Sequence, residues 1–543
     1  MEIRRVLRLA LIVAIMAGVT MQSSAAGPAA PPTLDSRDDT SALLNQYRPA
    51  APARDKLVAE AAAPAPDNAD ATALARFYHR RSKAAHGLGL VRQRIEDLEK
   101  ALTNAAGAPQ STGADGDELR ILSDLSSALA VQDLQKSDEY SERLLRHPKV
   151  SIGYVIGEHT RLANQLVARG DYSGAEPHLA QAEKALNEAR TRSSWKLYGA
   201  GWRSYLDSAR AYFLRDQGKL VEAEQLYRSA IALGDEDLAQ QAERVRLGVS
   251  TRTEQDILGQ QAQTARSLAI TLQWMGRLDE AELLMRDTLR NTLSRQGAQA
   301  PRVADELRAL AGILADQGRN RAALEMSRRA AEIARNSGLS PSAMTTIWAR
   351  HAYAGHLVSA GRYAEGIAEY ESLQRDLDNS STRAPAFVSA NAGWAYALIQ
   401  AKRTEPAITM LGEVIERGSR VLGADSINVG FARGYLGIAL HDAGRREEAL
   451  REFRVSIEIL TGAESGQLAY IRRSVPATRR LALISLAYIR LLEEVRGGEL
   501  ERRTGIDAAT ESFRLSDVVR GQAVQRAVAA SAARASADSG DLA

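Results

Sequence analysis

One pattern of residues recurs seven times along the 543-residue chain and constrains its fold more than any other feature. In the third copy the pattern consists of Ala269, Leu272, Gly276 and Ala281, and a large residue follows four positions later. The other copies keep the same offsets, with a small residue always three positions before the Leu. The seven leading leucines are Leu166, Leu214, Leu272, Leu314, Leu357, Leu398 and Leu440.

These offsets have a physical cause in helical geometry. A small residue and a Leu three positions apart lie on the same face of a helix, where the small residue lets a neighbouring helix approach closely. A Gly four positions after the Leu can end that helix in the left-handed conformation, after which a second helix starts. Each copy therefore predicts one helical hairpin with an apolar stripe that only neighbouring hairpins can cover. Strand patterns are absent, so we expect an all-α protein.

The pattern resembles the tetratricopeptide repeat (TPR), whose small residue, Leu, turn Gly and second-helix Ala have these spacings. The last four Ala-slot positions, at 323, 366, 407 and 449, are 43, 41 and 42 residues apart, as in a longer variety of that family. The earlier spacing of 58 residues between 223 and 281 predicts an insertion around 235–256. The resemblance implies a right-handed superhelical solenoid of TPR-like helical hairpins, with the first helix of each hairpin lining a concave groove.

The chain divides into segments by composition and by the quality of the repeats. The predicted segments are a signal peptide at 1–26, a Pro/Ala-rich disordered linker at 27–70, degenerate N-terminal helical repeats at 71–147, the array of seven clear repeats at 148–460, C-terminal capping helices and a junction helix at 461–530, and a disordered tail at 531–543. Terminal repeats of such arrays are commonly atypical, which agrees with the weak copies at both ends.

The first 26 residues have the three parts of a secretory signal. Arg4, Arg5 and Arg8 precede an apolar stretch of 11 residues from Leu9 to Val19. Small residues end the segment, and we expect cleavage after Ala26. The apolar stretch is shorter than the roughly 20 residues that span a bilayer. The sequence thus predicts a periplasmic or secreted protein without stable membrane insertion, and an uncleaved N-terminal anchor is the alternative.

Composition and motifs argue against catalysis, a metal site or a cofactor. The chain has no Cys, its eight His are scattered, and no His-Glu-x-x-His, Gly-x-Ser-x-Gly or phosphate-loop sequence occurs. The formal net charge is +3, too small for a dedicated nucleic-acid-binding surface. We therefore predict a non-enzymatic protein whose partner is a protein or a peptide.

The groove implied by the resemblance is the predicted binding site. In that family the lining residues lie two, three, six, ten and about thirteen positions before the turn Gly, and we transfer these offsets to the present chain. The candidates combine aromatic residues with Arg, which are enriched where binding energy concentrates. They are Tyr205, Tyr212, Arg215, Arg266, Trp274, Arg308, Trp348, His351, Asn391, Tyr396, Phe431 and His441.

A second resemblance gives an alternative function. Residues 511–527 are similar to the junction helix of bacterial proteins in which TPR arrays precede a CHAT domain, a caspase-like protease fold. That protease would require a Cys, which the chain lacks. The two hypotheses are a non-catalytic extracytoplasmic TPR scaffold, and the sensing portion of a TPR–CHAT protease whose catalytic domain is absent from this chain.

Overall fold

The computed structural model describes residues 51–105, 117–130, 132–249, 252–379, 391–462 and 474–517, and every regular element in these ranges is an α-helix. They belong to one unit, which starts at Leu44. The predicted signal segment, the linker up to residue 50 and the tail at 531–543 lie outside the described residues. Residues 51–62, inside the predicted linker, form helix α3 (Ala51–Ala62).

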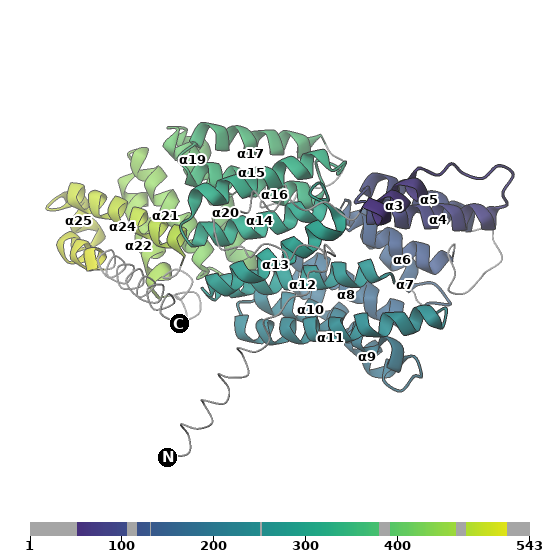
Figure 1. Ribbon diagram of the computed structural model, residues 1–543. Coiled ribbons are helices and arrows are strands. Elements are labelled where there is room, and N and C mark those ends of the chain that lie inside the picture. Colours follow the sequence, from purple (N-terminus) through teal and green to yellow (C-terminus); the bar gives the residue numbers. More distant parts are fainter. Residues whose placement is uncertain are drawn as a thin grey trace, which may run out of the picture. The chain divides into compact units, whose positions relative to one another are not determined.

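The helices alternate between first and second members of hairpins along the array (Figure 1). The first helices are α4 (Ala71–Gly87), α6 (Glu118–Leu129), α8 (Ile152–Arg169), α10 (Trp195–Asp216), α12 (Glu254–Trp274), α14 (Pro301–Asp316), α16 (Met344–Ser359), α19 (Ala392–Gln400), α21 (Ile427–Asp442) and α24 (Val475–Val495). The second helices are α5 (Val91–Ala105), α7 (Leu134–Leu145), α9 (Tyr172–Ala189), α11 (Leu220–Arg246), α13 (Leu278–Gln296), α15 (Asn320–Asn336), α17 (Tyr363–Asp378), α20 (Thr404–Leu422), α22 (Arg446–Gly462) and α25 (Glu499–Thr504). A final helical stretch covers 508–517.

The repeated Leu and Gly together form the turn inside each hairpin. In all seven copies the backbone N–H that follows the turn position donates to the carbonyl of the leading Leu, over 2.8 to 3.0 Å, which is the outer bond of a Schellman cap. The six turn glycines have φ between 74° and 84°. Lys402 replaces Gly in the sixth copy and still has φ 60°, so the hairpin geometry overrides the preference of a residue with a Cβ.

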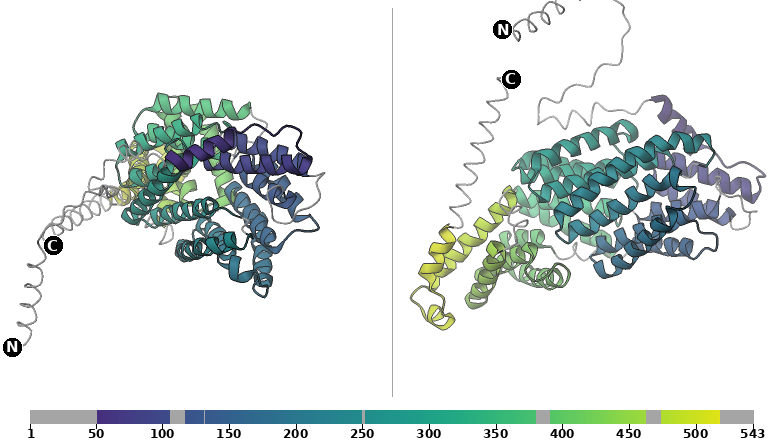
Figure 2. Two further views of the ribbon diagram at one scale, coloured as in Figure 1. Left: turned by 45° about the vertical axis from the view of Figure 1, so that its right-hand side comes forward. Right: turned by 90° about the horizontal axis from the view of Figure 1, so that it is seen from below.

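The small residue of each copy lies where the two helices of a hairpin pack. All seven are buried: Ala163, Ala211, Ala269, Ala311, Ala354, Ala395 and Gly437. A Cβ on Gly437 would lie 2.8 Å from Cδ1 of Phe453, which shows why this slot needs a small side chain. From α8 onward, the first helices of successive hairpins also pack on one another (Figure 2). The predicted all-α solenoid of TPR-like helical hairpins is confirmed.

The 58-residue spacing is accommodated by a longer second helix. Helix α11 continues to Arg246, and α12 starts at Glu254 with a capping box between Thr253 and Asp256. The predicted insertion at 235–256 is thus largely an extension of α11, followed by a short connection.

Hairpins that are distant in sequence also contact one another. The Gln255 side chain is 3.5 Å from the Gly87 carbonyl oxygen, and the Ser340 N–H donates to Oε1 of Gln132 over 3.3 Å. Helix α24 packs against α14, where the Ser474 hydroxyl donates to Asp316 Oδ1 over 2.7 Å. Each contact joins hairpins four or five positions apart, so the array returns on itself.

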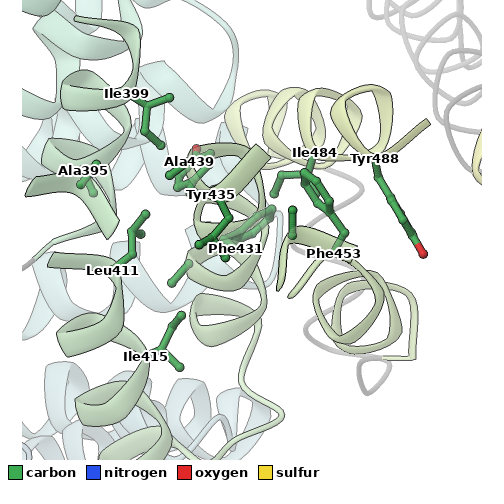
Figure 3. Close-up of a cluster of buried hydrophobic side chains, with 14 of the residues drawn as sticks. Ala395, Ile399, Leu411, Ile415, Phe431, Tyr435, Ala439, Phe453, Ile484 and Tyr488 are labelled. Atoms are coloured by element: carbon green, nitrogen blue, oxygen red, sulfur yellow. The ribbon is translucent and has the colours of Figure 1, made fainter. Parts of the chain in front are cut away.

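The largest hydrophobic cluster lies in the C-terminal hairpins. It joins buried side chains from α16 to the final helical stretch at 508–517 and includes Phe431, Tyr435, Phe453 and Tyr488 (Figure 3). The Phe453 and Tyr488 rings are stacked with centroids 5.2 Å apart. Separate clusters lie in α4–α7 and in α8–α10.

Candidate functional site

Seven of the twelve predicted groove residues come from four consecutive first helices and lie close to one another. We call this set the Arg–aromatic cluster, and it consists of Tyr212 and Arg215 on α10, Arg266 and Trp274 on α12, Arg308 on α14, and Trp348 and His351 on α16. Arg266 on α12 and Arg215 on α10 are close enough to Arg308 on α14 for their charges to act on it. First helices of three successive hairpins therefore direct cationic side chains toward one region.

Arg215 is held between two aromatic rings. Tyr212 precedes it by three positions on α10, so both side chains lie on one helix face, and the guanidinium carbon is 4.6 Å from the ring centroid of Tyr212. The ring centroid of Trp274, at the end of α12, lies 5.1 Å from the same guanidinium carbon, and Trp274 is 37% exposed. Asp216 accepts hydrogen bonds from Nε and Nη2 of Arg215 over 3.0 and 2.8 Å. Arg215 thus has both a neutralising carboxylate and a cation–π contact.

Arg266 lies near two acidic residues of α14. Its Nη1 atom is 4.0 Å from Asp305 Oδ2 and 3.9 Å from Glu306 Oε1. Glu306 is fully buried, and its Oε1 also accepts a 3.4 Å hydrogen bond from the Thr292 hydroxyl, whereas Oε2 has no hydrogen-bond partner among the described residues. Burial raises the pKa of Glu306 to about 7, although the charge of Arg266 acts in the opposite direction.

Arg308 differs from the other arginines of the cluster. Its guanidinium carbon lies 5.7 Å from the ring centroid of Trp348, and its Nε is buried without a hydrogen-bond partner within the described ranges. Burial lowers the pKa of Arg308, and the like charges of Arg266 and Arg215 act in the same direction, while Asp305 opposes them. The environment of Arg308 therefore disfavours its positive charge.

His351 continues the cluster as a neutral ring. Its imidazole makes edge contacts with Trp348 and Tyr370, with centroid distances of 6.3 and 5.5 Å. Burial lowers the pKa of His351 to about 4, and the charge of Arg308 adds to this effect. His351 is therefore uncharged near neutral pH.

The contacts given for the other five predicted groove residues are with residues outside the Arg–aromatic cluster. Tyr205 lies 4.9 Å from the guanidinium carbon of Arg252. Asn391 is buried and caps α19, where its side chain accepts from the Trp394 N–H over 2.7 Å. This capping role gives a structural reason for Asn at that position.

In the C-terminal hairpins, the predicted groove residues pack between helices. Tyr396 stacks on Tyr435 with centroids 4.9 Å apart. Phe431 is buried, and the guanidinium carbon of Arg480 lies 4.9 Å from its ring centroid. His441 Nε2 lies 3.1 Å from Glu494 Oε1 on α24. The structure thus does not bring these three residues to the Arg–aromatic cluster.

The sequence analysis did not identify a polar network between the N-terminal hairpins and α12. Arg94 Nη1 donates to Nδ1 of His86 over 2.8 Å, and His86 Nε2 lies 3.4 Å from Asp256 Oδ1. Nearby, His79 Nε2 and Asp124 Oδ2 are 2.9 Å apart. Asp256 on α12 is distant in sequence from His86 and Arg94, so no local spacing could have indicated this contact.

Other kinds of site are not formed by the described residues. Among them no group of three or more His, Asp or Glu side chains is arranged to hold a metal ion, and no helix has the length and apolar character needed to cross a membrane. A hollow of about 250 Å³ lies between α5, the turn after α6 and the Ser340–Ser342 segment. Half of its lining residues are charged, among them Arg92, Glu99 and Lys136.

The buried carboxyl of Glu306 gives a pH-dependent prediction. The pKa in the fold, about 7, is raised above the ordinary value of 4.5, so the protonated carboxyl stabilises the fold at pH 4.5 and below, and this contribution is lost as the pH rises through 7. The free energy of unfolding of Glu306→Gln minus that of the wild type should therefore be about 2–3 kcal/mol larger at pH 8 than at pH 4.5. Urea unfolding of both proteins at the two pH values measures this difference. A difference between the two proteins that is the same at both pH values would contradict the prediction.

Comparisons with known proteins agree with the repeat pattern. Residues 261–290, which cover the end of α12 and the start of α13, match the tetratricopeptide repeat family model. Among solved structures, a Rap protein complexed with competence and sporulation factor is 12% identical, with 75% of this chain and 99% of that chain covered and a TM-score of 0.42. The apo form of RapI is 11% identical, with 68% and 98% covered and a TM-score of 0.37. A putative kinesin light chain with TPR-like repeats from Podosopora anserina is 16% identical, with 37% and 96% covered and a TM-score of 0.29. No curated protein matches.

Proposed function

We propose that this protein is a non-catalytic extracytoplasmic scaffold that binds a peptide or protein partner at the Arg–aromatic cluster. The observation that carries the proposal is the gathering of Tyr212, Trp274 and Trp348 with three arginines on four consecutive first helices. Trp, Tyr and Arg are the residues in which the binding energy of protein interfaces concentrates. Solenoids of stacked repeats present such residues on extended surfaces, which suit them for binding other chains.

The extracytoplasmic location is supported by the first 26 residues of the sequence. Their basic start, short apolar stretch and small-residue end are typical of a secretory signal. Fractionation of cells that express the full chain tests this part of the proposal. The protein should appear in the envelope fraction without its first 26 residues, as N-terminal sequencing would show, and full-length protein in the cytoplasm would contradict it.

The binding part of the proposal is tested by substituting an exposed member of the cluster. Trp274→Ala should weaken capture of a partner from a native envelope extract by at least about tenfold, since an interface Trp typically contributes 2 kcal/mol or more. The matched control is Phe513→Ala, which removes a ring that is 66% exposed on the final helical stretch, distant in sequence from the cluster. Crosslinking and mass spectrometry identify and quantify the partner. Equal capture by both variants and the wild type would rule out this surface.

The TPR–CHAT alternative stays a prediction. It is supported by the sequence 511–527, of which residues 511–517 are described and helical. A gene for a caspase-like protease next to the coding sequence would favour a regulatory role, and none nearby would favour the stand-alone scaffold.

A further inference from the structure

Arg308 forms no ion pair with a described residue, whereas the other arginines of the cluster do. Arg215 is bonded to Asp216, and Arg266 lies 4.0 Å or less from Asp305 and Glu306. No hydrogen bond or ion pair joins Arg308 to any described residue, and its Nε is buried. The carboxylate of Asp305 acts on the charge of Arg308, but it lies beside Arg266 as well, so this positive charge is only partly compensated by the described part of the chain.

The residues next to Arg308 supply only part of the negative charge that its guanidinium needs. Asp305 is nearby, but it already accepts a 3.2 Å hydrogen bond from the Thr345 hydroxyl and lies beside Arg266. Trp348 offers only the face of its ring, and His351 is neutral. A cation–π contact contributes less than the desolvation of a guanidinium costs, so the site as it stands is unfavourable for the charge.

The surroundings also indicate the size of the missing group. The aromatic residues near Arg308 are spread over α10, α12 and α16, and Trp274 is 37% exposed. A lone small anion would contact only Arg308, whereas a polypeptide segment can place one carboxylate on Arg308 and other side chains on the rings of Tyr212, Trp274 and Trp348. Nucleic acid is disfavoured because the net charge is only +3 and the neighbouring arginines already have carboxylate partners.

We propose that the Arg–aromatic cluster recognises an acidic polypeptide segment, with an Asp or Glu side-chain carboxylate of the partner bound to Arg308. This inference rests on the proposed function and names the chemistry of its partner. A guanidinium and a carboxylate form a charge-assisted hydrogen bond, which would offset the cost of holding the Arg308 charge without an ion pair. Arg308 would thus contribute more to binding than to folding.

The first experiment uses the full chain and three fluorescent 12-residue peptides with acetylated and amidated ends. Leu alternates with Glu in the first peptide, with Gln in the second and with Lys in the third, so side-chain charge is the only charge that varies. Fluorescence anisotropy should show at least tenfold tighter binding of the Glu peptide than of the Gln peptide, and no binding of the Lys peptide. Equal affinity for the Glu and Gln peptides would overturn the proposal.

The second experiment separates binding from folding. Arg308→Met should reduce affinity for the Glu peptide at least tenfold, to the level of the Gln peptide, while the thermal unfolding midpoint stays the same or rises because an uncompensated charge is removed. The matched control is Arg420→Met on α20, where the arginine is 71% exposed and paired with Glu416, and this change should leave peptide binding unaltered. A lowered midpoint in Arg308→Met, or unchanged affinity for the Glu peptide, would show that Arg308 is not an anion-binding residue.

The two proposals can fail separately. If Trp274→Ala abolishes capture of the envelope partner but Arg308→Met does not, the cluster binds a partner that is not recognised through a carboxylate, and only the present inference falls. If Trp274→Ala has no effect on capture, the proposed function itself is wrong.

Discussion

Asp237→Ala should lower the free energy of unfolding by about 3–5 kcal/mol, because it leaves a buried guanidinium without its partner. Asp237 is 4% exposed and Arg244 is 3% exposed. Oδ1 of Asp237 accepts from Nη1 of Arg244 over 2.6 Å, and Oδ2 accepts from Nη1 of Arg252 over 3.1 Å. One carboxylate therefore pairs with two arginines, Arg244 in the extended part of α11 and Arg252 in the connection to α12.

This ion cluster also joins the extension of α11 to α10. Arg244 donates to the Leu197 carbonyl of α10 over 2.7 Å, in addition to its bond with Asp237. Gly201 allows the close approach, since a Cβ there would lie 2.7 Å from the Asp237 carboxylate. Loss of Asp237 should thus loosen the hairpin in which Tyr212 and Arg215 are located.

Chemical denaturation followed by circular dichroism measures the effect. The matched control is Glu183→Ala, which removes an acidic residue from a half-exposed ion pair with Arg210 and should cost less than about 1 kcal/mol. If both substitutions lower the free energy of unfolding equally, the buried ion cluster of Asp237 stabilises the fold no more than the half-exposed pair does. Replacing Asp237 by Leu together with Arg244 by Met should recover part of the loss, since a buried ion pair can be exchanged for apolar packing.

The hairpins could be predicted from the sequence because the signals that form them are local. The leading Leu, the turn Gly and the second-helix Ala lie within ten residues, and the same backbone cap results in every copy. Even Lys402 could be assigned to the turn, since the residues around it fix the register. Secondary structure and the contacts between adjacent hairpins therefore follow from the repeat pattern.

The repeat offsets could place seven of the predicted groove residues, from Tyr212 to His351, on four consecutive first helices, but their binding of a partner stays a prediction. The offsets did not indicate that Asn391 caps a helix or that Phe431 is buried in the core. Some contacts join hairpins that are four or five repeats apart. These contacts depend on how the small rotations between successive hairpins add up along the array, and the sequence of a single repeat does not determine that sum. The bond of Ser474 to Asp316, 158 residues away, is one result of that accumulation.

The absence of a partner for Arg308 likewise could not be predicted. The sequence has nearly equal numbers of basic and acidic residues, 70 and 67, so composition gives no reason to expect an uncompensated charge. Only the positions of Asp216 and Asp305 show that Arg215 and Arg266 form ion pairs and that Arg308 does not.

The substitution Phe453→Ala should cost about 3–5 kcal/mol, the range found when a buried aromatic ring is removed from a packed core. Phe453 is fully buried and occupies the large-residue slot of the seventh repeat. Its ring packs over Gly437 of α21 and stacks on Tyr488 of α24 (Figure 3). Because Gly437 has no side chain, nothing on α21 can fill the space that the ring would leave.

The loss should spread to α24 more than to the N-terminal hairpins, because stability in a repeat array depends on contacts between neighbours. Hydrogen exchange followed by mass spectrometry should show faster exchange over 475–495 in Phe453→Ala, and little change over 71–105. Leu486→Ala is the matched control, since Leu486 lies on the same helix α24 and is 56% exposed. Uniformly faster exchange along the whole chain would mean that the array unfolds as one cooperative unit, and the neighbour-by-neighbour account of its stability would then be wrong.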